Sequence, residues 1–157
     1  MGDLTISESQ TLTIEPGTEV IFLDYYKFDV LDNANLQAVG TADDPIVFSP
    51  LISAVGWGGI RFLGASDESR MEYCHLEYGK ATGSGAEGCG GAIFCAESDP
   101  DIRYCQIENC TAEKGGAIYC ENANPEIFGN TIVQNSASES GGGIYCLESN
   151  PTIGENS

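Results

Sequence analysis

Three short segments in the second half of the chain have nearly the same sequence. Residues 90–95 read GGAIFC, residues 115–120 read GGAIYC and residues 141–146 read GGGIYC, at steps of 25 and 26 residues. A unit of this length that recurs at a nearly constant step is the signature of a solenoid. In such a fold each unit is too small to bury its own apolar face, so it stacks on copies of itself.

Two further sets of residues follow the same step. One reads DPDI at residues 99–102, NPEI at 124–127 and NPTI at 150–153. The other reads CQI at residues 105–107 and NTI at 130–132. Each unit therefore holds short alternating segments separated by Gly, Asn, Asp and Pro, which is typical of strands joined by turns.

The repeat predicts an all-β coil of about six rungs, with roughly 25 residues per rung. Equivalent strands would stack in register as parallel sheets, with like residues about 4.8 Å apart. A helical solenoid is excluded, because no segment of about ten residues has helical apolar spacing free of Gly and Pro.

Both apolar columns of the repeat can be followed toward the amino terminus. The predicted earlier members are Ile14, Leu36 and Ile60 for the column of Ile93, and Val20, Ile46 and Met71 for the column of Ile102. A single long step then indicates one insertion of about six residues within residues 79–89. This segment is rich in Gly, Ala and Ser, and we interpret it as a surface loop rather than the wall of a catalytic groove.

The pattern resembles right-handed parallel β-helix proteins of the pectin-lyase-like superfamily, over nearly the whole chain. Residues 12–18 (LTIEPGT) and 39–48 (VGTADDPIVF) are similar to the first rungs of many secreted bacterial β-helices. The Gly-Gly-Ala-Ile units also resemble repeats of polymorphic outer-membrane adhesins. The resemblance implies one right-handed β-helix domain over residues 1–157, in an extracellular or cell-surface location. Because the last unit stops within a rung, we expect a segment of a longer protein.

The seven cysteines follow the repeat as well. The predicted inward stacks are Cys95, Cys120 and Cys146 in one column, and Cys74, Cys105 and Asn130 in another. We interpret the cysteines as buried thiols, and an inward Asn as a side chain that forms hydrogen bonds along the stack. A disulfide stays open as an alternative, with Cys89 of the insertion as the cysteine expected to pair or react, although the odd number of cysteines leaves at least one thiol unpaired within a monomer. We predict no metal site, because the sole histidine, His75, has no zinc-like spacing around it.

The residue after each inward isoleucine faces outward. This column reads Arg61, Phe94, Tyr119 and Tyr145, which we predict as ligand-binding residues because flat aromatic faces stack against sugar rings. The alternative is that the rings only stabilise the sheet, through cross-strand contacts of about 0.2–1 kcal/mol each.

The formal net charge is −18, from 6 basic and 24 acidic residues. It repels nucleic acid and anionic lipid, and the apolar runs are too short for insertion into a membrane, so we expect neither partner. A polysaccharide lyase that acts on uronates needs a groove that is locally positive. The basic residues of this chain are scattered along the sequence, which argues against such a groove. Glu72 and Arg103 are expected to pair with each other as surface ions. Paired acids such as Glu77 and Glu108 are too common to indicate a hydrolase.

We therefore predict a non-catalytic structural or adhesive segment, with carbohydrate as the expected ligand, no catalytic residues and no cofactor. The alternative is a polysaccharide lyase or glycoside hydrolase that acts in a groove on the outer face of the coil. Calcium is the one cofactor left open, at the oxygen-rich turns. These turns hold Glu97, Asn122 and Glu148 in one column and Asp99, Asn124 and Asn150 in another. The uncovered last strands predict an end-to-end homodimer through the C-terminal rung.

Overall fold

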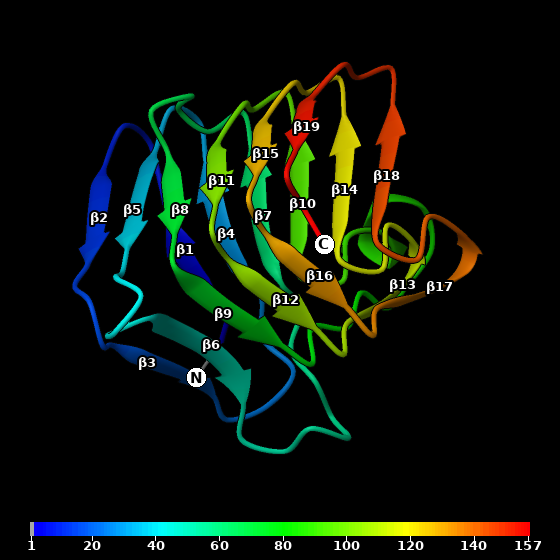
Figure 1. The fold of residues 1–157 in the computed structure, drawn as a ribbon, viewed down its shortest axis with the longest axis horizontal. Coiled ribbons are helices and arrows are strands. Elements are labelled where there is room, and N and C mark those ends of the chain that lie inside the picture. The colour runs from blue at the N-terminus through cyan, green and yellow to red at the C-terminus, as the bar shows by residue number, and fades with distance from the viewer. Residues whose placement is uncertain (1) are drawn as a thin grey trace.

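The computed structural model describes residues 2–157 as a stack of short parallel strands, and Met1 lies outside the described residues. Figure 1 shows the strands winding as a coil, from blue at one end to red at the other. The fold is a parallel β-helix, as the repeat predicts. Within the described chain, five rungs contribute a strand to each of three sheets, and a sixth rung contributes to two of them.

Each sheet collects the equivalent strands of successive rungs. Sheet 1 contains β1 (Leu4–Ile6), β4 (Phe28–Leu31), β7 (Ile60–Leu63), β10 (Ile93–Ala96), β14 (Ile118–Glu121) and β18 (Ile144–Leu147). Sheet 2 contains β2 (Thr11–Ile14), β5 (Asn35–Val39), β8 (Arg70–Glu72), β11 (Asp101–Arg103), β15 (Glu126–Phe128) and β19 (Thr152–Gly154). Sheet 3 contains β3 (Glu19–Phe22), β6 (Ile46–Pro50), β9 (Cys74–Glu77), β12 (Gln106–Glu108) and β16 (Thr131–Val133). A pair of strands, β13 (Thr111–Lys114) and β17 (Ser136–Ser140), follows sheet 3 in the fourth and fifth rungs.

The core consists of inward columns of apolar side chains, one from each sheet. Alternation places every second residue of a strand inside the coil. In the later rungs these columns are the predicted ones. The fully buried members are Ile60, Ile93 and Ile118 in sheet 1, Met71, Ile102 and Ile127 in sheet 2, and Leu76 and Ile107 in sheet 3.

The first predicted column is wrong in its amino-terminal half. Ile60 pairs with Phe28, and Phe28 pairs with Leu4. Leu36 and Ile14 lie in sheet 2 instead. The physical reason is that Phe, Leu and Ile fill an inward position equally well, so alternation alone does not tell one sheet from another.

The second predicted column is wrong in the same rungs. Met71 pairs with Ala38, whereas Val20 and Ile46 lie in sheet 3. The correct register also contains two long connections rather than one. The second of them, residues 51–59, joins β6 to β7 and exposes several apolar side chains.

The connection within residues 79–89 lies between two bridged pairs, Lys80 with Thr111 and Cys89 with Lys114. Nine residue steps separate Lys80 from Cys89, whereas three separate Thr111 from Lys114. Six residues are therefore extra at this place in the rung. They include a 3₁₀ turn, η1 (Gly85–Gly88).

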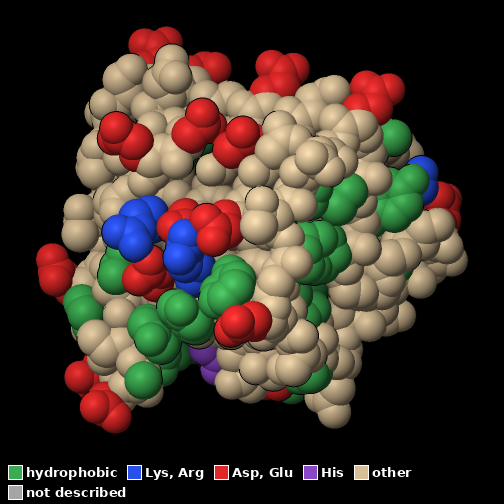
Figure 2. Space-filling model, turned by 45° about the horizontal axis from the view of Figure 1, so that its top comes forward, with side chains coloured by type: hydrophobic (Ala, Val, Ile, Leu, Met, Phe, Trp, Pro, Cys, Tyr) green, Lys and Arg blue, Asp and Glu red, His purple; other side chains and the backbone are tan. Residues whose placement is uncertain are grey.

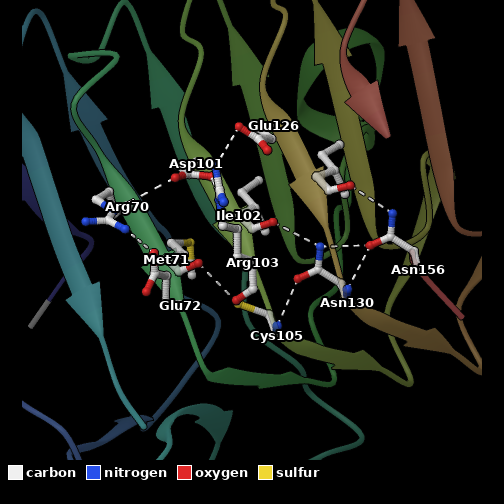
Figure 3. A network of polar contacts seen from close by, with 11 residues as sticks. Arg70, Met71, Glu72, Asp101, Ile102, Arg103, Cys105, Glu126, Asn130 and Asn156 are labelled. Carbon is white, nitrogen blue, oxygen red and sulfur yellow. Dashed lines mark hydrogen bonds and ion pairs between the residues drawn. The ribbon is translucent and has the colours of Figure 1, made fainter. Parts of the chain in front are cut away.

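Inward asparagines stabilise the corner between sheets 2 and 3 (Figure 3). The Asn130 side chain accepts a hydrogen bond from the Cys105 N–H at 2.8 Å and donates one to the Ile102 carbonyl at 3.0 Å. Asn156 repeats both contacts one rung on, with the Asn130 N–H and the Ile127 carbonyl. These amides satisfy backbone groups that the turn would otherwise bury without a partner. The predicted bonding along the stack is confirmed.

All seven cysteines are free, and six of them are buried. Cys95, Cys120 and Cys146 pair in register across β10, β14 and β18, as predicted. Burial raises the pKa of the Cys110 thiol to about 12, so this thiol stays protonated near neutral pH. A protonated, buried thiol behaves as a small apolar side chain.

Ile118 and Ile144 allow a test of the stacking, because they occupy the same column. Ile118 is fully buried with a strand on each side, whereas Ile144 is half-buried and has a paired strand on one side. We expect Ile118→Ala to lower the free energy of unfolding by about 2–5 kcal/mol and Ile144→Ala to lower it by clearly less. Urea unfolding followed by circular dichroism measures both. Equal losses would contradict a core built by stacking.

Candidate functional site

The outward column of sheet 1 forms a continuous stack. The Arg61 guanidinium lies 4.1 Å from the centre of the Phe94 ring. The ring centres of Phe94 and Tyr119 are 5.2 Å apart, and those of Tyr119 and Tyr145 are 5.5 Å apart, with nearly parallel planes. In-register pairing produces this stack, because each residue lies directly beside its equivalent.

The expectation that this stack is open to a ligand is wrong for three of its four members. Arg61, Phe94 and Tyr119 are only 3%, 1% and 5% exposed. Tyr145 is half-buried and keeps an accessible surface. Phe94 and Tyr119 form a second apolar cluster outside the coil, against which Tyr145 packs. The structure therefore supports the packing role of these rings.

Residues 80–89, here called the covering loop, close the column. The Arg61 guanidinium donates hydrogen bonds to the carbonyl oxygens of Ala86 and Cys89, at 2.9 and 3.4 Å. The Cys89 side chain packs against the aromatic rings. Arg61 thus binds the backbone of the covering loop, while the charge of its guanidinium lies over the face of the Phe94 ring.

Polar contacts also attach the covering loop to the second rung. Lys27 forms an ion pair with Glu87 at 2.7 Å, and this hydrogen bond lowers the pKa of Glu87. The Tyr25 hydroxyl donates to the Lys80 carbonyl and accepts from the Thr82 N–H. Because the ion pair is partly exposed, its own contribution is small. The loop is nevertheless held at several points, and it acts as a fixed cover.

The outer face of sheet 2 carries a network of ion pairs. Arg103 contacts Asp101 at 2.5 Å and Glu126 at 2.7 Å, and Arg70 pairs with Glu72 (Figure 3). The expected pair of Glu72 with Arg103 is therefore wrong, because each has a different partner. Figure 2 shows basic side chains of this face in contact with acidic ones. Both arginines are occupied, which argues against their use as a free catalytic base.

A shallow hollow lies at the corner between sheets 2 and 3. Tyr73 and Tyr104 stack there with ring centres 5.2 Å apart, and Tyr104 is 44% exposed. The hollow has a volume of about 200 Å³, and its lining also includes Thr41, His75 and Gln106. In this hollow the exposed ring of Tyr104 adjoins side chains that can form hydrogen bonds.

Sequence reasoning missed these two tyrosines because both occupy turns. Tyr73 and Tyr104 have backbone φ values of 47° and 52°, a left-handed conformation that is uncommon for a bulky residue. The equivalent residue of the next rung is Gly129, at 68°. A usable signal was present, since each tyrosine follows by two residues a member of the aligned column, Met71 or Ile102.

The oxygen-rich turns considered for calcium have a structural use. Asp99 accepts a hydrogen bond from the Asn124 N–H at 2.5 Å, and the Asn124 side chain repeats this contact one rung on. Among the described residues, the group whose metal-ligating atoms lie close together is a different one, His75, Glu77 and Glu108.

A family model described as the right-handed β-helix region matches residues 4–157. The chain belongs to this family. No curated protein and no solved structure matches it significantly. Family membership establishes the fold, whereas the ligand has to be argued from the surface.

The covering loop can be tested through the thiol that it buries. Arg61→Met keeps an apolar stem over Phe94 and removes both hydrogen bonds to the loop. We expect iodoacetamide to label Cys89 about thirtyfold faster in this variant, since the two hydrogen bonds contribute about 1 kcal/mol each and therefore about 2 kcal/mol together. Mass spectrometry of the alkylated peptide gives the rate. Arg70→Met, on the face of sheet 2, serves as the control, and equal labelling in both variants would contradict the role of Arg61.

Proposed function

We propose that this β-helix is a non-catalytic adhesive module of a secreted or cell-surface protein, and that it binds carbohydrate in the hollow beside Tyr104. One observation carries the proposal. The stack of Tyr73 and Tyr104 presents an exposed aromatic surface next to polar side chains. The binding surface proposed here thus lies at the corner of sheets 2 and 3, rather than on the largely buried column of sheet 1.

The chemistry of the hollow suits a sugar ring. One face of a pyranose is apolar and packs on an aromatic ring, while its hydroxyl groups need donors and acceptors at the edge. Tyr104 supplies the ring, and Thr41, His75 and Gln106 supply the polar edge. The volume of about 200 Å³ is below that of drug-sized ligand pockets. We therefore expect one or two sugar residues to bind, with dissociation constants of roughly micromolar to millimolar.

The rigid coil supports such a weak site. The strands beneath the hollow are anchored by Leu76 and Ile107, which are fully buried. The tyrosine rings are already stacked on each other before any ligand arrives. A preorganised surface loses little conformational entropy on binding, so shallow contacts suffice for measurable affinity.

The enzymatic alternative requires catalytic side chains on the outer face of the coil. A lyase needs a free base beside the uronate, whereas Arg70 and Arg103 are held in ion pairs. A hydrolase needs two carboxyl groups that flank the glycosidic bond, and Glu77 and Glu108 lie opposite each other in register on sheet 3. The test is whether the protein releases reducing or unsaturated ends from pectin, alginate or neutral glucans. Release that is abolished by Glu108→Gln would contradict our proposal and support the enzymatic alternative.

No helix among the described residues is long and apolar enough to span a membrane. The location at the cell surface is part of the same proposal, since an adhesive module binds glycans that are displayed outside the cell. The strong acidity of the chain favours neutral or cationic glycans over polyanionic ones.

A glycan array tests the site directly. We expect Tyr104→Ala to weaken binding about tenfold, because it removes the exposed ring, and Tyr145→Ala to leave binding unchanged. Both variants remove one tyrosine from an aromatic column, so they are matched in chemistry. If Tyr145→Ala abolished binding and Tyr104→Ala did not, the site would lie on sheet 1, as the sequence alone predicts.

The end-to-end homodimer stays a prediction. Among the described strands, β18 and β19 each pair on one side only, and Leu147 and Ile153 are exposed there. If this edge associates, the apparent mass should rise with protein concentration and with salt, which screens repulsion between the acidic chains. Static light scattering measures this. A constant monomer mass at all salt concentrations would contradict the prediction.

A further inference from the structure

Three side chains with metal-ligating atoms meet on the outer face of sheet 3. His75 and Glu77 lie two residues apart on β9, so they point to the same face. Glu108 of β12 pairs in register with Glu77. The His75 Nε2 and Glu108 Oε1 atoms are 3.2 Å apart, and one ligand atom from each of the three residues lies within 4.8 Å of the others.

The two carboxylates of this cluster have no lysine or arginine partner among the described residues. Glu77 and Glu108 are like charges directly opposite each other on adjacent strands, an arrangement that destabilises a sheet. Within the described chain, no lysine or arginine forms an ion pair with either carboxylate, and the next residue of the column is Val133. A cation between the two carboxylates would remove this repulsion.

The strands also hold the three groups in place. Leu76 and Ile107, which alternate with the cluster residues, are fully buried and fix both strands on the core. Gln106 donates a hydrogen bond to Oε2 of Glu108 at 3.1 Å, which orients the other oxygen toward His75. The cluster residues are half-buried, so their ligand atoms are reachable from solvent.

We propose that His75, Glu77 and Glu108 bind a divalent transition-metal ion of the zinc class. One imidazole nitrogen and two carboxylate oxygens suit Zn²⁺, whereas Ca²⁺ and Mg²⁺ prefer oxygen ligands alone. Two ligands at about 2.0 Å from a tetrahedral ion are about 3.3 Å apart, close to the separation of the His75 and Glu108 atoms. Three protein ligands leave a coordination position for water or for a donor from another molecule.

This inference does not rest on carbohydrate binding. Glu77 lies outside the lining of the hollow, so its substitution separates the two functions. A failure of glycan binding would leave the metal site intact, and a failure of metal binding would leave the tyrosine surface intact. The two proposals share His75 as a direct contact, and Gln106 lines the hollow while it orients Glu108.

Calorimetric titration with ZnCl₂ tests the site. The exposed thiol is removed first by Cys146→Ser, so that it does not compete for the metal. We expect one site per chain, with affinity reduced about tenfold or more by Glu77→Gln or by Glu108→Gln. Glu19→Gln is the matched control, since it removes the same charge from an exposed position on β3 of the same sheet, and it should leave the affinity unchanged. Equal weakening by Glu19→Gln would overturn the proposal in favour of diffuse attraction by the acidic surface.

A second readout keeps the test decisive if a variant fails to fold. His75 is the only histidine, so its ring signals in a proton NMR spectrum are unambiguous. Zn²⁺ should shift them in the Cys146→Ser protein, and an excess of Ca²⁺ should not. Co²⁺ should give weak visible bands without an intense sulfur charge-transfer band. Ring signals unmoved by saturating Zn²⁺, or a strong sulfur band with Co²⁺, would overturn the proposal.

Discussion

Everything in this molecule depends on the in-register stacking of equivalent parallel strands. Each residue lies about 4.8 Å from its equivalents in the neighbouring rungs, so the chemistry chosen for one position is repeated in space. Inside the coil this favours apolar columns such as that of Ile93 and Ile118. A polar residue is tolerated inside where it bonds along the stack, as the Asn130 side chain does by accepting from the Cys105 N–H and donating to the Asn156 side chain.

The same constraint turns the outer surface into columns with different properties. On sheet 1 the rings of Phe94 and Tyr119 stack, and the covering loop then closes over them. On sheet 2 Arg103 is placed between acids of its own and the next rung, so opposite charges cancel. On sheet 3 Glu77 and Glu108 lie opposite each other with no lysine or arginine paired to either among the described residues, and His75 contacts Glu108. The acids of sheet 2 are thus paired with arginines, whereas the two facing glutamates of sheet 3 have only His75 beside them.

The later rungs could be predicted from the sequence because they repeat whole phrases. The columns of Cys95 and Cys120, and of Ile102 and Ile127, have the predicted partners. The early rungs lack these phrases, and an alternating apolar residue such as Leu36 fits any of the three sheets. Register there is set by the lengths of the connections. Because residues 51–59 form a second long connection, a constant step counted back from Ile60 reaches residues of a different sheet.

The sequence repeat by itself determined the period, the parallel β-helix fold, the inward columns of cysteine and asparagine, and the stacking of Phe94 on Tyr119. These features depend only on residue type at a constant step. Whether a column is open to solvent was decided by the tertiary structure. Arg61 reaches the backbone of Ala86, and that contact buries rings which the period places on the surface. The tyrosines of the open hollow come from turns of two different rungs. Exposure and proximity of this kind arise from contacts between residues distant in sequence, and a local repeat pattern does not contain them.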